Sequence, residues 1–130
     1  NRDYTIQILM GLRDYYNRHV VNPEESLRTQ PMILYNLSKA LGCAQRYDEC
    51  VEVCNEGIRI ARETGRCSYL GLTLYNKAWS LLKRGQKGDH MLAMDILRRA
   101  YHFDEIMGKE GAMQRCRDLW AQHFPDDELL

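Results

Sequence analysis

The sequence predicts an all-α fold in which antiparallel pairs of helices stack on one another as a solenoid. The first observation is a repeat, because the tripeptide Leu-Tyr-Asn at residues 34–36 recurs forty residues later at 74–76. Each copy opens an amphipathic helix that a second helix follows, and one such pair cannot bury its apolar face without a neighbour. The second observation is that no segment shows the period-two alternation of a strand. We therefore expect five or six helices in a single domain, residues 1–130.

Residues 1–29 are expected to form a leading helix and a connector. Apolar side chains recur every three or four residues between positions 4 and 19, which is the period of an amphipathic helix. Asn22 followed by Pro23 is typical of a helix start, because the Asn side chain can cap the first turn and proline fits there. The helix that begins at this point is expected to be short and to end near Thr29.

The first helix pair is expected to span residues 31–65. Pro31 starts a helix whose apolar residues keep helical spacing to about Ala44. Asp48 is the expected N-cap of the second helix. That helix should stop at Gly65, because glycine readily adopts the left-handed conformation found after a helix C-terminus.

The second pair is expected to span residues 67–108. Its first helix runs over 68–83 and is followed by two glycines. Asp89 is the expected N-cap of the second helix, which should end at one of the next glycines. A terminal helix over 112–124 is expected to cap the stack before Pro125 ends it.

The composition and charge of the chain argue against some classes of function. Lys and Arg number 18, as do Asp and Glu, so the chain is neutral and lacks the basic field that drives nucleic-acid binding. No apolar run approaches the roughly 18 residues needed to span a bilayer. The five cysteines lack the spacing of a disulfide framework, which favours a reducing cytoplasm. Because the chain begins at Asn1 and not at methionine, we expect it to be a fragment of a longer protein.

Residues 33–61 resemble a tetratricopeptide repeat without a gap. The positions that match that family's pattern are Leu34, Leu37, Ser38, Leu41, Tyr47, Cys50 and Gly57. Two departures are Ser38 in place of the usual glycine and the lack of a bulky aromatic near Cys54. A looser second copy matches at Leu74, Ala78, Leu81, Gly85, Ala93, Leu97 and Ala100. The resemblance implies a right-handed superhelix with the first helix of each pair on the concave face.

A wider resemblance is carried by residues 31–38, 46–50, 74–82 and 97–108. Together they look like the C-terminal helical domain of bacterial Xre-type helix-turn-helix regulators, the group that includes peptide-pheromone sensors. This resemblance implies a ligand-sensing and dimerisation domain whose ligand is often a short peptide. It also implies that DNA is bound only by an N-terminal domain that is absent here.

On the matching positions, seven side chains would line the concave groove: Tyr35, Asn36, Lys39, Tyr75, Asn76, Trp79 and Lys83. A carboxamide offers donors and an acceptor, so Asn36 and Asn76 are expected to clamp the backbone of an extended peptide. Tyrosine and tryptophan supply flat apolar contacts of the kind enriched at binding hot spots. The alternative is structural: the Asn side chains bond neighbouring helices and the aromatic rings belong to the core.

Neither a metal site nor catalysis is expected. Cys50 and Cys54 lie one helical turn apart, but zinc sites usually need four ligands and no second pair is near, so both are expected in the core. The histidines are scattered, and no nucleophile–base pair can be assembled from the sequence. We therefore expect no cofactor, no metal and no enzymatic activity.

The apolar side of residues 4–19 predicts a partner, because an exposed end of a solenoid needs a polar cap or a neighbour. We expect a homodimer or a helix that this chain lacks. The leading hypothesis is a ligand-sensing and dimerisation domain of a cytoplasmic transcription regulator, with a short peptide or small effector in the groove. The alternatives are a tetratricopeptide-like protein–protein scaffold unrelated to transcription, and a regulator domain that only dimerises.

Overall fold

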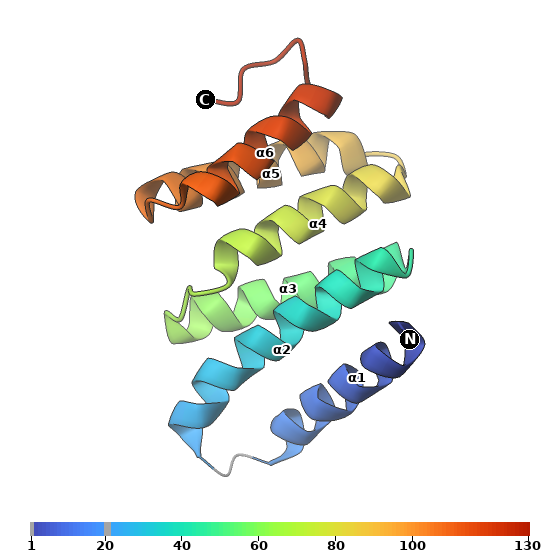
Figure 1. Ribbon diagram of the computed structural model, residues 1–130, viewed down its shortest axis with the longest axis vertical. Coiled ribbons are helices and arrows are strands. Elements are labelled where there is room, and N and C mark those ends of the chain that lie inside the picture. The colour runs from blue at the N-terminus through green and yellow to red at the C-terminus, as the bar shows by residue number, and fades with distance from the viewer. Residues whose placement is uncertain (1, 20–21) are drawn as a thin grey trace.

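The computed structural model describes residues 2–19 and 22–130, and these residues form six α-helices and no strand (Figure 1). The helices are α1 (Arg2–Arg18), α2 (Pro23–Cys43), α3 (Tyr47–Thr64), α4 (Leu70–Arg84), α5 (Asp89–Ile106) and α6 (Glu110–His123). The prediction of an all-α chain with five or six helices is confirmed. None of the helices in the described part of the chain is long and apolar enough to cross a membrane.

Successive helices run in opposite directions, and each packs on the next (Figure 1). In addition α4 contacts both α2 and α6, so these three helices form one layer, with α3 and α5 behind it. That the helices form the stacked pairs of a solenoid stays a prediction. The helix α1 lies against α2 at the end of the stack. The right-handed superhelix itself stays a prediction.

The helix α2 is continuous where the sequence predicted two helices. The expected break between Thr29 and Pro31 is wrong, because Pro31 lies inside α2. Proline lacks the N–H that would bond to the carbonyl of Leu27, which normally costs helix stability. Pro31 is buried, and α2 packs against α1, α3 and α4, so tertiary contacts override the local preference.

Of the four residues predicted by name to cap a helix, two are confirmed and two are wrong. The side chain of Asn22 accepts hydrogen bonds from the first turn of α2, and Gly65 ends α3 with a φ of 71° in the left-handed region. Neither Asp48 nor Asp89 is an N-cap, because both lie inside the first turn of their helices. Both carboxylates instead bind Arg84.

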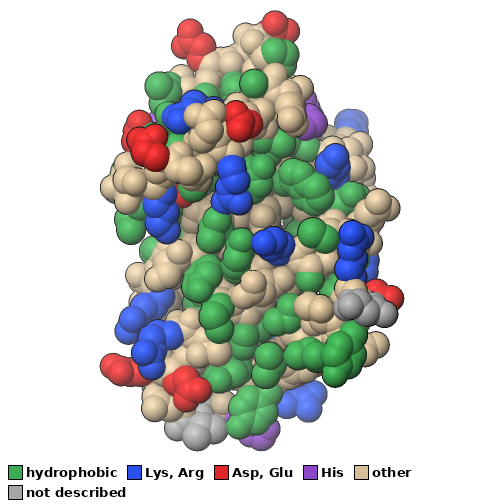
Figure 2. Space-filling model, in the orientation of Figure 1, with side chains coloured by type: hydrophobic (Ala, Val, Ile, Leu, Met, Phe, Trp, Pro, Cys, Tyr) green, Lys and Arg blue, Asp and Glu red, His purple; other side chains and the backbone are tan. Residues whose placement is uncertain are grey.

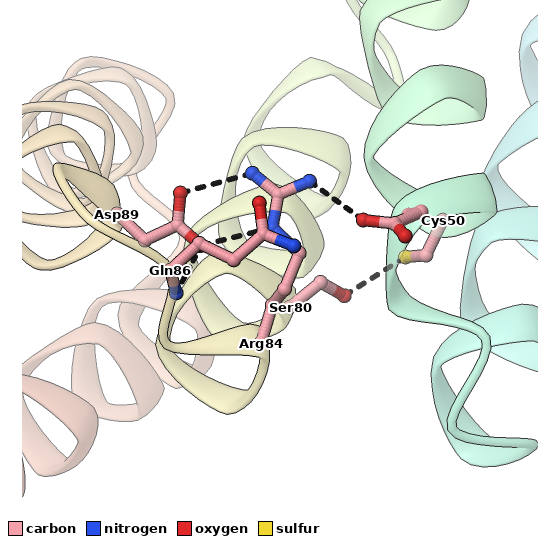
Figure 3. A network of polar contacts seen from close by, with 6 residues as sticks. Cys50, Ser80, Arg84, Gln86 and Asp89 are labelled. Carbon is pink, nitrogen blue, oxygen red and sulfur yellow. Dashed lines mark hydrogen bonds and ion pairs between the residues drawn. The ribbon is translucent and has the colours of Figure 1, made fainter.

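Arg84, at the end of α4, joins the starts of two other helices (Figure 3). Its Nε and Nη2 donate to the two carboxylate oxygens of Asp89 at 2.9 Å each, and its Nη1 donates to Asp48 Oδ1 at 2.9 Å. Asp89 also accepts from the backbone N–H of Gln86 at 3.0 Å. Because charge-assisted pairs are stronger than neutral hydrogen bonds, this network fixes the α4–α5 turn against α3.

The core consists of two clusters of apolar side chains that meet along α3. One cluster joins α1, α2 and α3, and the other joins α3 to α6. Leu34 and Leu74, the first residues of the repeated tripeptide, are both buried, one in each cluster. The repeat in the sequence is therefore a repeat of packing positions, which sets the residues that follow each leucine on equivalent faces of α2 and α4.

The Arg84 network predicts a loss of stability in acid. The hydrogen bond from Arg84, followed by that from the backbone of Gln86, holds the pKa of Asp89 below its usual value of about 3.9. Because the folded-state pKa is depressed, the stabilisation is present above about pH 4 and is lost as the pH falls toward the lower folded-state pKa. Asp89→Asn should lower the free energy of unfolding at pH 7 by about 2 kcal/mol.

Urea unfolding followed by circular dichroism between pH 7 and pH 3 measures this effect. The Asp89→Asn protein should lose less stability on acidification than the parent protein. Asp95→Asn is a matched control, because Asp95 pairs with Arg99 on the surface and its side chain is 57% exposed. Equal acid sensitivity of the parent and Asp89→Asn proteins would contradict the assigned role.

Candidate functional site

A cavity of about 190 Å³ lies between α2 and α4 and is called the α2/α4 cavity below. Its lining side chains come from four helices: Tyr35, Ser38, Lys39, Gly42, Cys43, Cys50, Tyr75, Asn76, Trp79, Ser80 and Arg115. Figure 2 shows the face formed by α2, α4 and α6, on which hydrophobic and basic side chains are interspersed. The acidic side chains in this view lie toward its ends and edges.

The structure brings five of the seven predicted groove residues around this cavity, namely Tyr35, Lys39, Tyr75, Asn76 and Trp79. The other two lie outside it. Asn36 borders a separate hollow between α1 and α2, and its side chain donates to the carbonyl of Met32 in its own helix at 2.9 Å. Lys83 lies one turn beyond Trp79, with its ammonium 5.5 Å from the ring centroid.

The two asparagines are separated because Asn76 faces α2, whereas Asn36 faces α1. Asn76 faces α2, where its side-chain N–H donates to Ser38 Oγ at 3.1 Å. The same position of the repeat in α2 faces α1, so Asn36 borders the hollow on that side. Asn76 therefore bonds a neighbouring helix, as the structural alternative expected, and also lines the cavity.

The floor of the cavity is a chain of hydrogen bonds that crosses three helices. Cys50 Sγ in α3 donates to the carbonyl of Ser38 in α2 at 3.1 Å, and Ser80 Oγ in α4 donates to Cys50 Sγ at 2.9 Å (Figure 3). No buried side-chain nitrogen or oxygen in the described part of the chain lacks a partner. The floor is thus polar, fully satisfied and fixed in position.

The cysteines of α3 are core residues, as the sequence predicted. Cys50 and Cys54 are both buried. The neighbouring thiol of Cys54 lowers the pKa of Cys50, and the proximity of Cys50 together with burial raises the pKa of Cys54. Among residues 2–19 and 22–130, no three side chains of the metal-ligating types are grouped closely enough to hold an ion.

The walls of the cavity are aromatic rings that have their own supports. Tyr35 stacks on Tyr69 with ring centroids 5.5 Å apart, and Trp79 meets the ring of Tyr47 edge-on at 5.9 Å. Gly42 allows Trp79 to approach, because a Cβ at this position would lie 3.2 Å from the indole. Rings held in this way are available to a ligand at little cost in conformational entropy.

Arg115 of α6 is a cavity residue that sequence analysis missed. Its guanidinium lies over the ring of Tyr75 at 4.9 Å from the centroid. The signal was present in the repeat, because Tyr35, Tyr75 and Arg115 follow one another at the same spacing of forty residues. Treating the last helix as a cap concealed that it supplies the third member of the series.

Comparison of the chain with protein-family models, with curated proteins and with solved structures gave no match. Function is therefore inferred from the α2/α4 cavity and from the surface of the chain. The cavity combines rigid apolar rings, one carboxamide, two cationic groups and a polar floor. Such a combination is suited to binding a ligand.

The burial of the cysteine side chains predicts which thiols react in the folded protein. Cys43 is exposed, whereas Cys50, Cys54 and Cys116 are buried, and burial raises the pKa of Cys116 to about 12. Because the thiolate is the reactive form and access is required, Cys43 should be alkylated by iodoacetamide long before the three buried cysteines. Peptide mass spectrometry of samples quenched over time measures the order, and Cys54 or Cys116 reacting as fast as Cys43 would contradict this packing.

Proposed function

We propose that this chain is the ligand-sensing and dimerisation domain of a transcription regulator whose DNA-binding domain lies outside the chain. The observation that carries the proposal is the α2/α4 cavity, whose wall is built from equivalent positions of successive helix pairs, Tyr35, Tyr75 and Arg115. The neutral charge of the chain supports the assignment of DNA binding to another domain, because binding to phosphates needs a basic surface. The proposed role is binding without catalysis, and such a regulator would act in the cytoplasm.

The ligand in this proposal is a short peptide or a small effector. Asn76 lies at the cavity with its N–H directed to Ser38, so its side chain is held in place beside the bound molecule. Tyr35, Tyr75 and Trp79 offer the flat apolar surface that anchors a ligand. The helices themselves need not rearrange for a ligand to enter, because the cavity is already formed.

The surface proposed for dimerisation is an apolar stripe on the outer side of α1, called the α1 stripe. Its side chains remain exposed in the chain by itself: Tyr4 at 65%, Ile8 at 45%, Leu12 at 41% and Tyr15 at 49%. The opposite side of the helix packs on α2 through the buried Ile6. A helix with apolar residues on two sides is typical of one that is covered on both.

A second copy of this chain is the proposed occupant, because the α1 stripe is complementary to itself. If two α1 helices pack antiparallel about their middle, Tyr4 lies opposite Tyr15 of the other copy and Ile8 lies opposite Leu12. A twofold axis makes both sets of contacts at once. Gly11 lies on the same side with nothing within 4 Å of a Cβ, so the two helices can approach closely there.

The cavity and the α1 helix are neighbours, which gives the proposal a route from ligand to dimer. Lys39 and Cys43 line the α2/α4 cavity and also the hollow between α1 and α2. A ligand that changes the position of Lys39 acts directly beside α1. To regulate, it must bind one arrangement of the two copies more tightly than the other.

A second candidate is a tetratricopeptide-like scaffold that binds proteins and has no role in transcription. The α1 stripe favours it as well, because a different protein could cover the same side chains. The encoded sequence before residue 1 separates the two, since a helix-turn-helix pattern supports the regulator and further helix pairs support the scaffold.

Ligand binding is tested by incubating the protein with cell extract, purifying it again and identifying retained small molecules or peptides by native mass spectrometry. Asn76→Ala should lower retention at least tenfold, because the substitution removes a polar group of the cavity and releases its bond to Ser38. Asn36→Ala is the matched control, since Asn36 occupies the equivalent repeat position outside the cavity. Circular dichroism checks that both variants keep their helices, and unchanged retention by Asn76→Ala would place the ligand elsewhere.

Dimerisation is tested by light scattering on the eluting protein at micromolar concentration. The parent protein should have the mass of a dimer, and Ile8→Asp should be a monomer, because a carboxylate cannot be buried unpaired in the α1 stripe. Ile106→Asp makes the same change at a residue that is 82% exposed on α5 and should leave the dimer intact. A monomeric parent protein would rule out the second copy as the occupant.

A further inference from the structure

We infer that the α2/α4 cavity takes a small organic anion, a carboxylate on an apolar or aromatic body, and that Lys39 and Arg115 hold its charge. This inference rests on the proposed ligand-sensing function and gives the ligand a chemical class.

The side chains that line the cavity carry charge of only one sign. Lys39 and Arg115 are its charged residues, and none of the described lining side chains is a carboxylate. The chain as a whole has equal numbers of basic and acidic residues, so this local excess does not follow from composition. A concave site lined with one sign of charge concentrates ligands of the opposite sign.

Among the described residues, neither of these two cations has a carboxylate counter-ion. Neither Lys39 nor Arg115 has a carboxylate within 4.0 Å among the described residues, in contrast to Arg84, which pairs with Asp48 and Asp89; the other described lysines likewise form no ion pair. Asp104 and Asp118 are the acids near Arg115 and Tyr75, but neither lines the cavity. A ligand anion would therefore meet cations that are not already paired.

The ring of Tyr75 orients the side chain of Arg115. Its guanidinium lies over the ring of Tyr75, which limits the positions that the side chain samples. A guanidinium held in this way keeps its N–H edge available for a planar carboxylate, with which it can form two parallel hydrogen bonds. Lys39 lies on α2, across the cavity from α4, and adds a second positive charge.

The volume of the α2/α4 cavity limits the size of the ligand. The cavity holds about 190 Å³, which is below the roughly 300 Å³ at which pockets for drug-sized ligands begin. Tyr35, Tyr75 and Trp79 bound this small space with flat rings, which suit an aromatic or branched apolar body. The carboxylate could belong to a free organic acid or to the C-terminus of a short peptide, and the volume favours the free acid, because most of a peptide would remain outside.

The experiment compares matched acids and amides on the full chain. The probes are 3-phenylpropionate and its neutral isostere 3-phenylpropanamide, together with one phenylalanine-terminated tetrapeptide carrying either a free or an amidated C-terminus. Binding is followed by chemical shifts of the Asn76 side-chain amide and the Trp79 indole. The acid should bind at least tenfold more tightly than its amide, and the difference should shrink as salt is added.

Charge-removing variants assign the effect to the two cations. Lys39→Gln and Arg115→Gln should each weaken binding of 3-phenylpropionate at least fivefold and leave the affinity for the amide unchanged. Lys87→Gln and Arg66→Gln are matched controls, because both residues are exposed and neither lines the cavity, and they should change neither affinity.

The outcomes separate this inference from the function on which it rests. Equal affinity for acid and amide, or no binding of any probe by a protein that retains a ligand through Asn76, overturns the anion and leaves the sensing role standing. If the protein binds no probe and retains no molecule from the extract, both the anion-binding site and the ligand-sensing function are contradicted. Preference for the free-ended tetrapeptide over 3-phenylpropionate supports the carboxylate but assigns it to a peptide end.

Discussion

The rest of this structure depends on the need of each helix pair for a neighbour. A pair of amphipathic helices has more apolar surface than it can bury by itself, so α4 packs on α3 and α5 and also touches α2 and α6. Leu34 and Leu74 are buried in successive clusters and set the rotation of α2 and α4 about their axes. Once that rotation is fixed, Tyr35 and Tyr75 must reach the same face. Arg84 adds a polar restraint by joining α4 to the starts of α3 and α5.

The α2/α4 cavity follows from the size of the residues where these helices approach. Ser38, Gly42, Cys50 and Ser80 are all small, and each lies at the floor of the cavity. Larger apolar residues there would fill the space and remove the hydrogen-bonded floor. Two of the aromatic rings around this floor contact a further ring, Tyr35 with Tyr69 and Trp79 with Tyr47, which limits their movement toward the floor. A set of packing residues thereby leaves a site with apolar walls, a polar floor and cations at its edge.

Sequence reasoning predicted most of the residues that line the α2/α4 cavity, and its errors concern which helices lie next to each other. It found Tyr35, Lys39, Tyr75, Asn76 and Trp79 from the repeat, because equivalent residues of stacked helices share a face. It placed Asn36 with them, although the neighbour of α2 on that side is α1. It also missed Arg115, whose helix it treated only as a cap. In each case the deciding fact was which helix lies next to the residue, and periodicity within one helix does not contain that information.

The sequence by itself determined that the chain is helical, where most helices end and which residues repeat, since these follow from apolar spacing and from the local chemistry of Asn22 and Gly65. The tertiary structure alone decided that α2 runs through Pro31, because burial of that segment against its neighbours outweighs the lost backbone hydrogen bond. It also decided that Asp89 binds Arg84 and does not cap a helix. Local sequence preferences reflect the interactions of one segment with itself and with water. In the folded protein, the contacts of that segment with the surrounding helices also contribute to its conformation.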